Sequence, residues 1–371
     1  MPVIQKPAKL SAANRLARSL AAKFLENGNY EAIGMPLSHS AASQYAQAAS
    51  TSDVDPFFEE EAGFSGLAVH SVGYTAGADE EEVVIYVTKG SKKSIEAISQ
   101  EIDRVPIRAI VLGKVKTGPL PAMSAQGLGN LFERNSRIAC GSSCAPSGQT
   151  YAGTLGALVR KDNRMMALSN NHVFGACNHT PVGMPILSPS PMDARPGRRG
   201  PTEILRYNRM VELRSGDPVL VPPMRLDAAT ADVVNENLLS SWQGDDTDGF
   251  DTPGVTVAPT ANLRVKKAGR TTGVTIGVCE AFVPTPWILP YKTGKFSAMV
   301  WFSDTWTVRS NDTDPFALAG DSGSLIVKED GSAAVGLLFA VNNKGQYGIM
   351  MPIQSVLQAF SNPVLVSGHG I

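Results

Sequence analysis

From about residue 137 onward, the chain is a succession of short apolar and β-branched runs separated by Gly, Pro, Asn and Asp. Clear examples are AGTLGALVR, RMMALSNNHVF, DAATADVV, GVTIGVCEAFV, SAMVWFSDTW and SAAVGLLFAV. Strands at this spacing, without long helices between them, are typical of a β-sandwich or a β-barrel. A helical pattern returns only at residues 352–362. Because the range 137–371 is long enough for two packed barrels, we expect a mainly β fold.

The first part of the chain predicts different structures. Residues 11–26 place apolar side chains at helical spacing, namely Leu16, Leu20 and Phe24. A polar segment rich in small residues follows at 35–62 and predicts a long loop. We therefore expect residues 1–62 to form an N-terminal helix and a long loop.

Residues 63–116 predict a small α+β domain with the element order β-β-α-β. The expected strands cover residues 66–74, 83–88 and 105–115, and the expected helix covers 91–102. Gly and Pro without periodicity then indicate a linker at residues 117–136.

The charge balance excludes some classes of partner. The net charge is −1 over 371 residues, whereas proteins that bind nucleic acid or anionic membranes need a surplus of basic residues. No apolar run is long enough to span a bilayer. The N-terminal segment lacks the apolar core and cleavage site of a secretion signal. We expect a cytoplasmic protein from a bacterium-like setting, with no nucleic-acid or membrane partner.

The four cysteines leave one question about metal binding open. A reducing compartment favours free thiols, and no motif in the sequence calls for a cofactor. A zinc site is nevertheless conceivable, because four ligand-type side chains are close in sequence: Cys140, Cys144, Cys177 and His179. The C-x3-C spacing of the first pair is looser than the usual C-x2-C, so no metal is the preferred prediction.

Three segments of the β unit carry residue types suited to nucleophilic catalysis. In ALSNNHVFG an apolar strand ends in small polar residues before His172, a placement that holds an imidazole rigidly and leaves one face open. In RLDAATADVV, Asp227 precedes an apolar run, as a buried acid that orients a histidine would. Asp232 competes for that role. Taken singly, the histidine and the acid are more simply explained as structural residues.

The segment LAGDSGSLIV is more specific. A serine nucleophile needs a tight turn that exposes its hydroxyl and directs backbone N–H groups at the developing oxyanion. Gly320 permits that geometry before Ser322, and the apolar run after Ser324 anchors the turn in a buried strand.

Together these segments resemble the motifs of trypsin-like serine peptidases with the chymotrypsin fold. LAGDSGSLIV is similar to their Gly-Asp-Ser-Gly-Gly motif, with Ser324 in place of the second glycine. LSNNHV resembles the Asn-x-His-Val form of bacterial and plant members, and LDAATADVV is similar to their aspartate motif. The chain order His172, Asp227, Ser322 is that of chymotrypsin. AGTLGALV and KKAGRTTGVTIGVCEAF further resemble a bacterial branch that is similar to plant narrow-leaf-type proteins.

The resemblance covers roughly residues 137–360 and implies a two-barrel peptidase domain after the small α+β domain. It implies that His172 is the general base, that Asp227 orients it and that Ser322 is the nucleophile. The N–H groups of Gly320 and Ser322 would form the oxyanion hole. In trypsin the acid that matches Asp321 pairs with a new N-terminus created by cleavage. No such cleavage site is evident here, so we expect another partner for Asp321, or none before activation.

The resemblance also suggests where the substrate pocket lies. The position six residues before the nucleophile is Phe316, with Asp312 and Asp314 nearby. The pocket wall falls on Phe339, Ala340 and Val341. Apolar side chains there predict a shallow pocket and a preference for a small or apolar residue before the cleaved bond.

The leading hypothesis is a serine endopeptidase that acts on a protein or peptide substrate through an acyl-enzyme. Regulation through the N-terminal domain, by an activating protein or by self-association, is part of that hypothesis. One alternative is a catalytically silent scaffold that holds a peptide in the cleft. Another is a zinc-stabilised interaction module.

Overall fold

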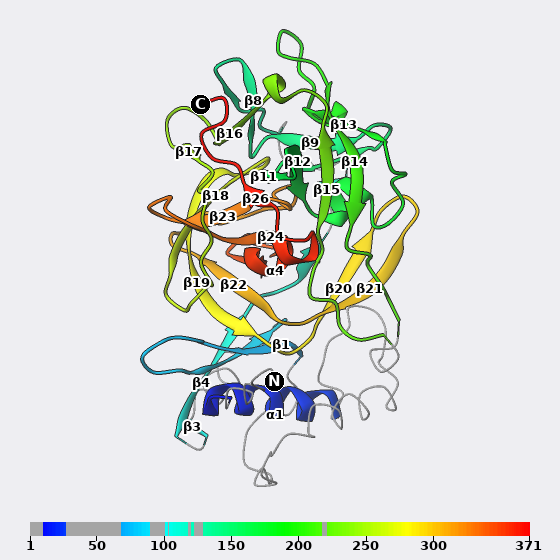
Figure 1. Cartoon of the computed structure of the whole chain (residues 1–371). Coiled ribbons are helices and arrows are strands. Elements are labelled where there is room, and N and C mark those ends of the chain that lie inside the picture. The colour runs from blue at the N-terminus through cyan, green and yellow to red at the C-terminus, as the bar shows by residue number, and fades with distance from the viewer. Residues whose placement is uncertain are drawn as a thin grey trace, which may run out of the picture.

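The computed structural model describes residues 10–26, 68–89, 101–102, 104–117, 120–121, 129–216 and 221–371. These residues form a mainly β protein with few helices, as predicted (Figure 1). None of the helices within these ranges is long and apolar enough to cross a membrane.

A closed six-stranded barrel forms the C-terminal half. Its strands follow the order β18-β23-β24-β25-β22-β19, and β19 pairs back with β18 to close it. Their bounds are β18 Arg264–Gly269, β19 Gly273–Val283, β22 Thr305–Ser310, β23 Leu325–Lys328, β24 Ala334–Asn342 and β25 Tyr347–Pro352. Helix α4, Ile353–Ala359, packs on this barrel through its apolar face.

A nine-stranded sheet forms the second large unit, in the upper part of Figure 1. Its strands follow the order β26-β11-β12-β15-β14-β13-β9-β10-β6. Their bounds are β6 Leu120–Pro121, β9 Ser143–Pro146, β10 Tyr151–Thr154, β11 Ala157–Lys161, β12 Arg164–Ser169, β13 Pro185–Ser188, β14 Thr202–Met210, β15 Ala229–Val233 and β26 Val364–Leu365. The sheet surrounds its own apolar cluster, which includes Leu158, Ala167 and Leu205.

Two smaller sheets complete the β unit. The four-stranded sheet has the order β17-β16-β8-β7, and β20 pairs with β21 as a separate hairpin. Their bounds are β7 Glu133–Arg134, β8 Arg137–Cys140, β16 Leu239–Gln243, β17 Phe250–Asp251, β20 Trp287–Lys292 and β21 Ser297–Phe302.

The three strands expected before residue 116 are present as β1 (Val69–Tyr74), β2 (Val83–Val87) and β4 (Val105–Val111). They extend the sheet of the closed barrel, because Tyr74 of β1 pairs with Phe282 of β19. The division into domains at 63–116 and 117–136 stays a prediction.

The helix predicted at 91–102 is wrong for its last two residues. Glu101 and Ile102 form strand β3 (Glu101–Ile102) and pair antiparallel with the start of β4, across a turn in which Arg104 has a φ of +62°. The spacing of the apolar residues had placed Ile102 on the face of a helix, but in the structure Ile102 belongs to this hairpin. The rest of the predicted helix, and the long loop at 35–62, lie outside the described residues.

Helix α1 (Ala12–Glu26) matches the prediction for 11–26 and packs across the N-terminal strands (Figure 1). Leu16, Leu20 and Phe24 are all buried in one apolar cluster with residues of β1 and β2. Burial of side chains of this size contributes about 2 kcal/mol each. The helix therefore holds the N-terminal strands together as one packed layer.

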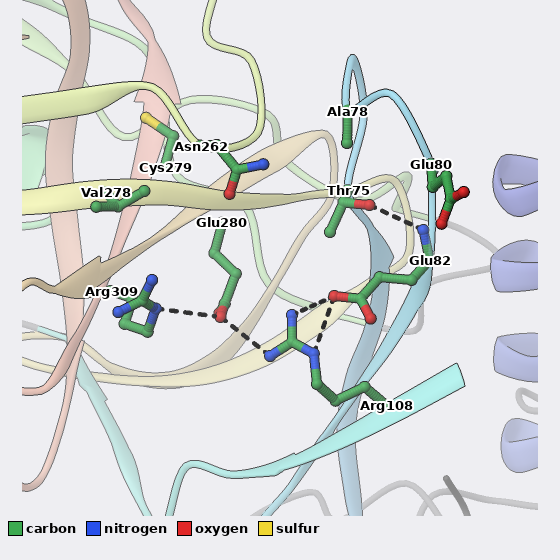
Figure 2. Close-up of a pocket in the computed structure, with 10 residues that line it drawn as sticks. All are labelled: Thr75, Ala78, Glu80, Glu82, Arg108, Asn262, Val278, Cys279, Glu280 and Arg309. Atoms are coloured by element: carbon green, nitrogen blue, oxygen red, sulfur yellow. Dashed lines mark hydrogen bonds and ion pairs between the residues drawn. The ribbon is translucent and has the colours of Figure 1, made fainter. Parts of the chain in front are cut away.

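An ionic network joins these N-terminal strands to the barrel (Figure 2). The Arg108 guanidinium on β4 contacts Glu82 and, at 3.2 Å, Glu280 of β19. Arg309 lies 3.6 Å from the same Glu280 carboxylate. Burial raises the pKa of the Glu280 carboxyl, and the arginines oppose that effect. These groups line a pocket of about 410 Å³, together with Glu80.

Candidate active site

Strand pairing brings His172 and Asp227 together. β12 and β15 are neighbours with Ser169 opposite Ala229, so the segments beyond these residues converge. His172 lies in a short π-helical turn, Asn171–Gly175, after the end of β12. Its Nδ1 contacts Asp227 Oδ2, and its backbone N–H donates to Asp227 Oδ1 at 3.1 Å. Both side chains are buried, so the two groups form a dry pair.

Tyr291 of β20 adds a third donor that the sequence analysis did not find. Its hydroxyl donates to Asp227 Oδ2 at 2.7 Å, and its ring packs edge-on to His172. Burial raises the pKa of the Tyr291 hydroxyl well above its usual value, and the Asp227 carboxylate raises it further. The hydroxyl therefore stays protonated and donates to the carboxylate.

The sequence did carry a weak signal for Tyr291. Trp287, Leu289 and Tyr291 alternate along β20 and are all buried. A tyrosine on the apolar face of a strand needs a hydrogen-bond partner for its hydroxyl. Nothing in the sequence indicates that this partner is Asp227.

The Ser322 turn lies against the strand that leads to His172. The backbone N–H of Thr154 donates to Ser322 O at 3.0 Å, and Ser169 Oγ donates to the carbonyl oxygen of Thr154 at 2.7 Å. Gly323 has a φ of +96°, and a Cβ there would lie 2.2 Å from Ser169 Oγ. Glycine is therefore required at 323 both for its conformation and for this close approach.

The serine and histidine are both buried, and no hydrogen bond joins their side chains. Ser322 Oγ donates to the carbonyl oxygen of Phe339 at 3.4 Å. His172 Nε2 is buried and has no hydrogen-bond partner in the part of the chain that the structure describes. The exposed fractions are only 0% for His172 and 4% for Ser322, so the reactive atoms are covered.

A side-chain hydrogen bond fixes the orientation of the peptide before Gly320. Thr271 Oγ1 donates to the carbonyl oxygen of Ala319 at 2.8 Å. Because a trans peptide directs its C=O and N–H in opposite directions, the Gly320 N–H points away from Thr271. Within the described ranges, no acceptor receives a hydrogen bond from the N–H of Gly320 or Ser322. Both donors are free for a ligand.

Asp321 has the partner that the sequence left unidentified. It is buried and lies 3.5 Å from the buried ammonium of Lys267, on β18. Its carboxylate also accepts from the backbone N–H groups of Thr271, Thr272 and Leu318 and from the Thr272 hydroxyl. Burial lowers the pKa of the Lys267 ammonium, and the Asp321 carboxylate opposes that effect. The turn is thus held by a side-chain cation.

Lys267 was also missed, although strand alternation points to it. Val265 and Lys267 occupy alternate positions of β18 and are both buried. A lysine on the inward face of a strand requires a charged partner. The sequence gives no indication of which acid that partner is.

The structure separates the four expected pocket residues into two groups. Phe316 and Val341 belong to one apolar cluster, and Lys267 Nζ lies 5.9 Å from the Phe316 ring centroid. Phe339 and Ala340 belong to the other large cluster, where Phe339 packs on Phe302. All four side chains are buried. Asp312 and Asp314 lie on the exposed loop after β22.

The possible zinc ligands are not assembled. Within the described ranges, no group of three or more His, Cys, Asp and Glu side chains is arranged to hold a metal ion. Cys140 and Cys144 are buried in one apolar cluster and Cys177 in another. Burial raises the pKa of Cys140 to about 12, and it raises those of Cys144 and Cys177 as well. His179 bonds instead to the carbonyl of Cys177.

No protein-family model and no curated protein matches the chain. Among similar solved structures, Thermobifida fusca protease A is 14% identical with a TM-score of 0.41, and the match covers 62% of this chain and all of that one. A glutamic acid specific serine protease is 15% identical with a TM-score of 0.40, and the match covers 62% of this chain and 100% of that one. The alpha-lytic protease homolog N4 is 18% identical with a TM-score of 0.39, covering 61% and 98%.

These neighbours are chymotrypsin-fold serine proteases. At such low identities and TM-scores, the likeness carries no weight for the activity of this chain. The similarity to plant narrow-leaf-type proteins stays a prediction.

Proposed function

We propose that the chain is a serine endopeptidase, with Ser322 as nucleophile and His172 as general base. The observation that carries the proposal is the buried Asp227–His172 pair, in which His172 Nε2 has no hydrogen-bond partner among the described residues. Asp227 keeps the proton on Nδ1, so Nε2 has a lone pair free to accept the serine proton.

The reaction follows from these positions. Ser322 Oγ attacks the carbonyl carbon of the peptide bond as its proton passes to His172 Nε2. The N–H groups of Gly320 and Ser322 bind the oxyanion. The C–N bond then breaks, His172 gives its proton to the leaving amine, and water hydrolyses the acyl-enzyme by the same route. The substrate in this proposal is a cytoplasmic protein or peptide.

A reactive fluorophosphonate tests the nucleophile directly. Attack by Ser322 Oγ forms a P–O bond and expels fluoride, while the serine proton passes to His172. We expect one label per chain, mapped to Ser322 by tandem mass spectrometry, and none on heat-unfolded protein. A label on another serine contradicts the proposal. So does the absence of label in both the native chain and the Lys116→Pro variant described below.

The alternative of a silent peptide-binding scaffold is favoured by one observation. The reactive atoms are covered, and the Ser322 hydroxyl is bonded to Phe339 rather than to His172. A scaffold would bind peptide and never take up the label, so the same experiment separates the two functions.

Tyr291→Phe is expected to reduce kcat by about 10-fold, because the Asp227 carboxylate loses a hydrogen bond that fixes its position and, through it, the position of the His172 ring. A carboxylate with one donor fewer attracts the imidazolium proton more strongly, so the acid limb of kcat/KM against pH should move to higher pH. Steady-state kinetics across pH measures both effects.

Tyr86→Phe is the matched control for that change. Tyr86 is another buried tyrosine, and its hydroxyl is bonded to Thr307 at 2.7 Å and to Glu280 at 3.4 Å, not to Asp227. It should lower stability comparably without moving the pH profile. Equal pH profiles for Tyr291→Phe and Tyr86→Phe would assign Tyr291 a purely structural role.

A further inference from the structure

Strand β5 (Val115–Thr117) occupies the edge of β24 that leads to the nucleophile. β23 pairs with β24 as far as Leu337, and Gly323 and Ser324 bond to Leu338, so β23 leaves the edge open from Phe339 onward. β5 pairs antiparallel with this part, in the register Ala340–Thr117, Val341–Lys116 and Asn342–Val115. Thr117 thus lies opposite Ala340. The residue before Ala340 is Phe339, and the Phe339 carbonyl oxygen is 3.4 Å from Ser322 Oγ.

The hydrogen-bond pattern can be derived from one flanking bond. The backbone N–H of Asn343 donates to the carbonyl oxygen of Lys114 at 2.7 Å. Hydrogen-bonded pairs in an antiparallel ladder alternate with non-bonded ones. Lys116 and Val341 are therefore a hydrogen-bonded pair, and the N–H and C=O of Lys116 both face β24. The Lys116 side chain is exposed, so Lys116 contributes to the pairing only through its backbone.

The chain is attached a second time to a strand that contacts Ser322. β6 pairs with β10 in the register Ala152–Leu120 and Tyr151–Pro121. Thr154, at the end of β10, is the residue that donates to Ser322 O. The two attachments, β5 on β24 and β6 on β10, are therefore both made to strands that contact Ser322, and only two residues of sequence separate them.

The N-terminal strands fix β5 in this place. Between β4 and β5, the carbonyl oxygen of Leu112 accepts from Asn342 Nδ2 at 2.9 Å. The Gly113 carbonyl is 2.6 Å from His70 Nε2 on β1, and Gly113 has a φ of +68°. The side chain of Val115 is buried, and the Thr117 hydroxyl donates to the carbonyl of Pro290, next to Tyr291.

We propose that β5, continued by β6, is an internal peptide that holds the active site closed by occupying the strand position a substrate needs. An extended peptide binds a sheet edge through its main chain, and here that edge is already filled. A tethered segment competes at an effective concentration of roughly millimolar. This inference rests on the proposed function and assigns its regulation to the joint between the N-terminal strands and the barrel.

The first test compares Lys116→Pro with Lys116→Ala. Proline removes the N–H that faces β24, whereas alanine keeps it, and the exposed side chain is lost in both. We expect Ser322 of Lys116→Pro to react with the fluorophosphonate at least 10-fold faster than Ser322 of the native chain, and Lys116→Ala to match the native chain. Gly113→Ala, whose Cβ would lie 2.6 Å from Asn343 Oδ1, is a second variant expected to accelerate labelling. Labelling of Ser322 at the same measurable rate in all four proteins would overturn the proposal.

The second test does not depend on catalysis. A fluorescein-labelled peptide with the sequence of residues 113–121, GKVKTGPLP, is titrated by anisotropy into Ser322→Ala proteins with and without Lys116→Pro. We expect binding at least 10-fold tighter to the double variant, whose edge is free, and weaker binding of a peptide carrying proline in place of the second lysine. Equal binding, or none, would overturn the proposal.

The two tests also separate this inference from the proposed function. Differential peptide binding without labelling of Ser322 in any variant would support the internal peptide and contradict the peptidase. Labelling of Ser322 at equal rates, with equal peptide binding, would support the peptidase and contradict the internal peptide.

Discussion

Asp227→Asn is expected to lower kcat/KM by about 10,000-fold, the scale of loss when a triad histidine is held in the wrong tautomer. The native carboxylate accepts from the His172 backbone N–H on one oxygen, and from His172 Nδ1 and Tyr291 on the other. The asparagine amide has only one oxygen, so it can accept the hydrogen bonds on one side of the carboxylate but not those on the other. Because the Tyr291 hydroxyl can rotate to accept and the backbone N–H cannot, the new NH₂ should face Nδ1.

That orientation moves the imidazole proton to Nε2, where it can no longer accept the proton of Ser322. Steady-state hydrolysis of a peptide substrate measures the loss. Asp232→Asn is the matched control, since the Asp232 carboxylate on β15 contacts Arg164 and Asn208 and not His172. It should stay within about 3-fold of the native rate. A comparable loss in both variants would argue against Asp227 as the orienting acid.

Lys267→Met is expected to reduce the free energy of unfolding by about 3 kcal/mol, because it leaves Asp321 as a buried charge without its cation. The volume of the side chain is nearly kept, so the loss is electrostatic. The Asp321 carboxylate stabilises the Ser322 turn, because it accepts hydrogen bonds from the backbone N–H groups of Leu318 and of residues 271–272. We therefore expect labelling of Ser322 to slow as well. Denaturant unfolding and labelling kinetics measure the two effects.

Lys266→Met provides the comparison on the same strand. Lys266 is only partly buried and lies over the Phe250 ring at 4.5 Å. Loss of such a contact costs about 0.5–1 kcal/mol and should leave labelling unchanged. If Lys267→Met were no more destabilising than Lys266→Met, Lys267 would not be the cation that neutralises Asp321.

Local patterns predicted a large part of this fold. The spacing of Leu16, Leu20 and Phe24 located helix α1 and its buried face. Runs of β-branched residues located β1, β2 and β4, because alternation is a property of neighbouring residues. The same reasoning assigned Ile102 to a helix, since a two-residue strand has too few positions to show a period.

The candidate site was predictable only where one short segment carries the chemistry. His172 and Ser322 stand in such segments, and Asp227 was preferred over Asp232 by its resemblance to a motif. Tyr291 and Lys267 act on partners that are distant in sequence, and no local pattern encodes such pairings. The proposed role of β5 is the hardest to predict from sequence, because it depends on how β5 pairs with β24, a strand more than 200 residues later in the chain.

If the chain is the proposed peptidase, the Lys267–Asp321 pair has a consequence for when it becomes competent. A cation created by cutting the chain arrives late and cannot be withdrawn, so maturation of that kind runs in one direction. A lysine is present as soon as the chain is synthesised, and the nucleophile turn can form with it during folding. Control must then act on access to the site, and a barrier held by main-chain hydrogen bonds can be lifted and restored many times in the life of one molecule.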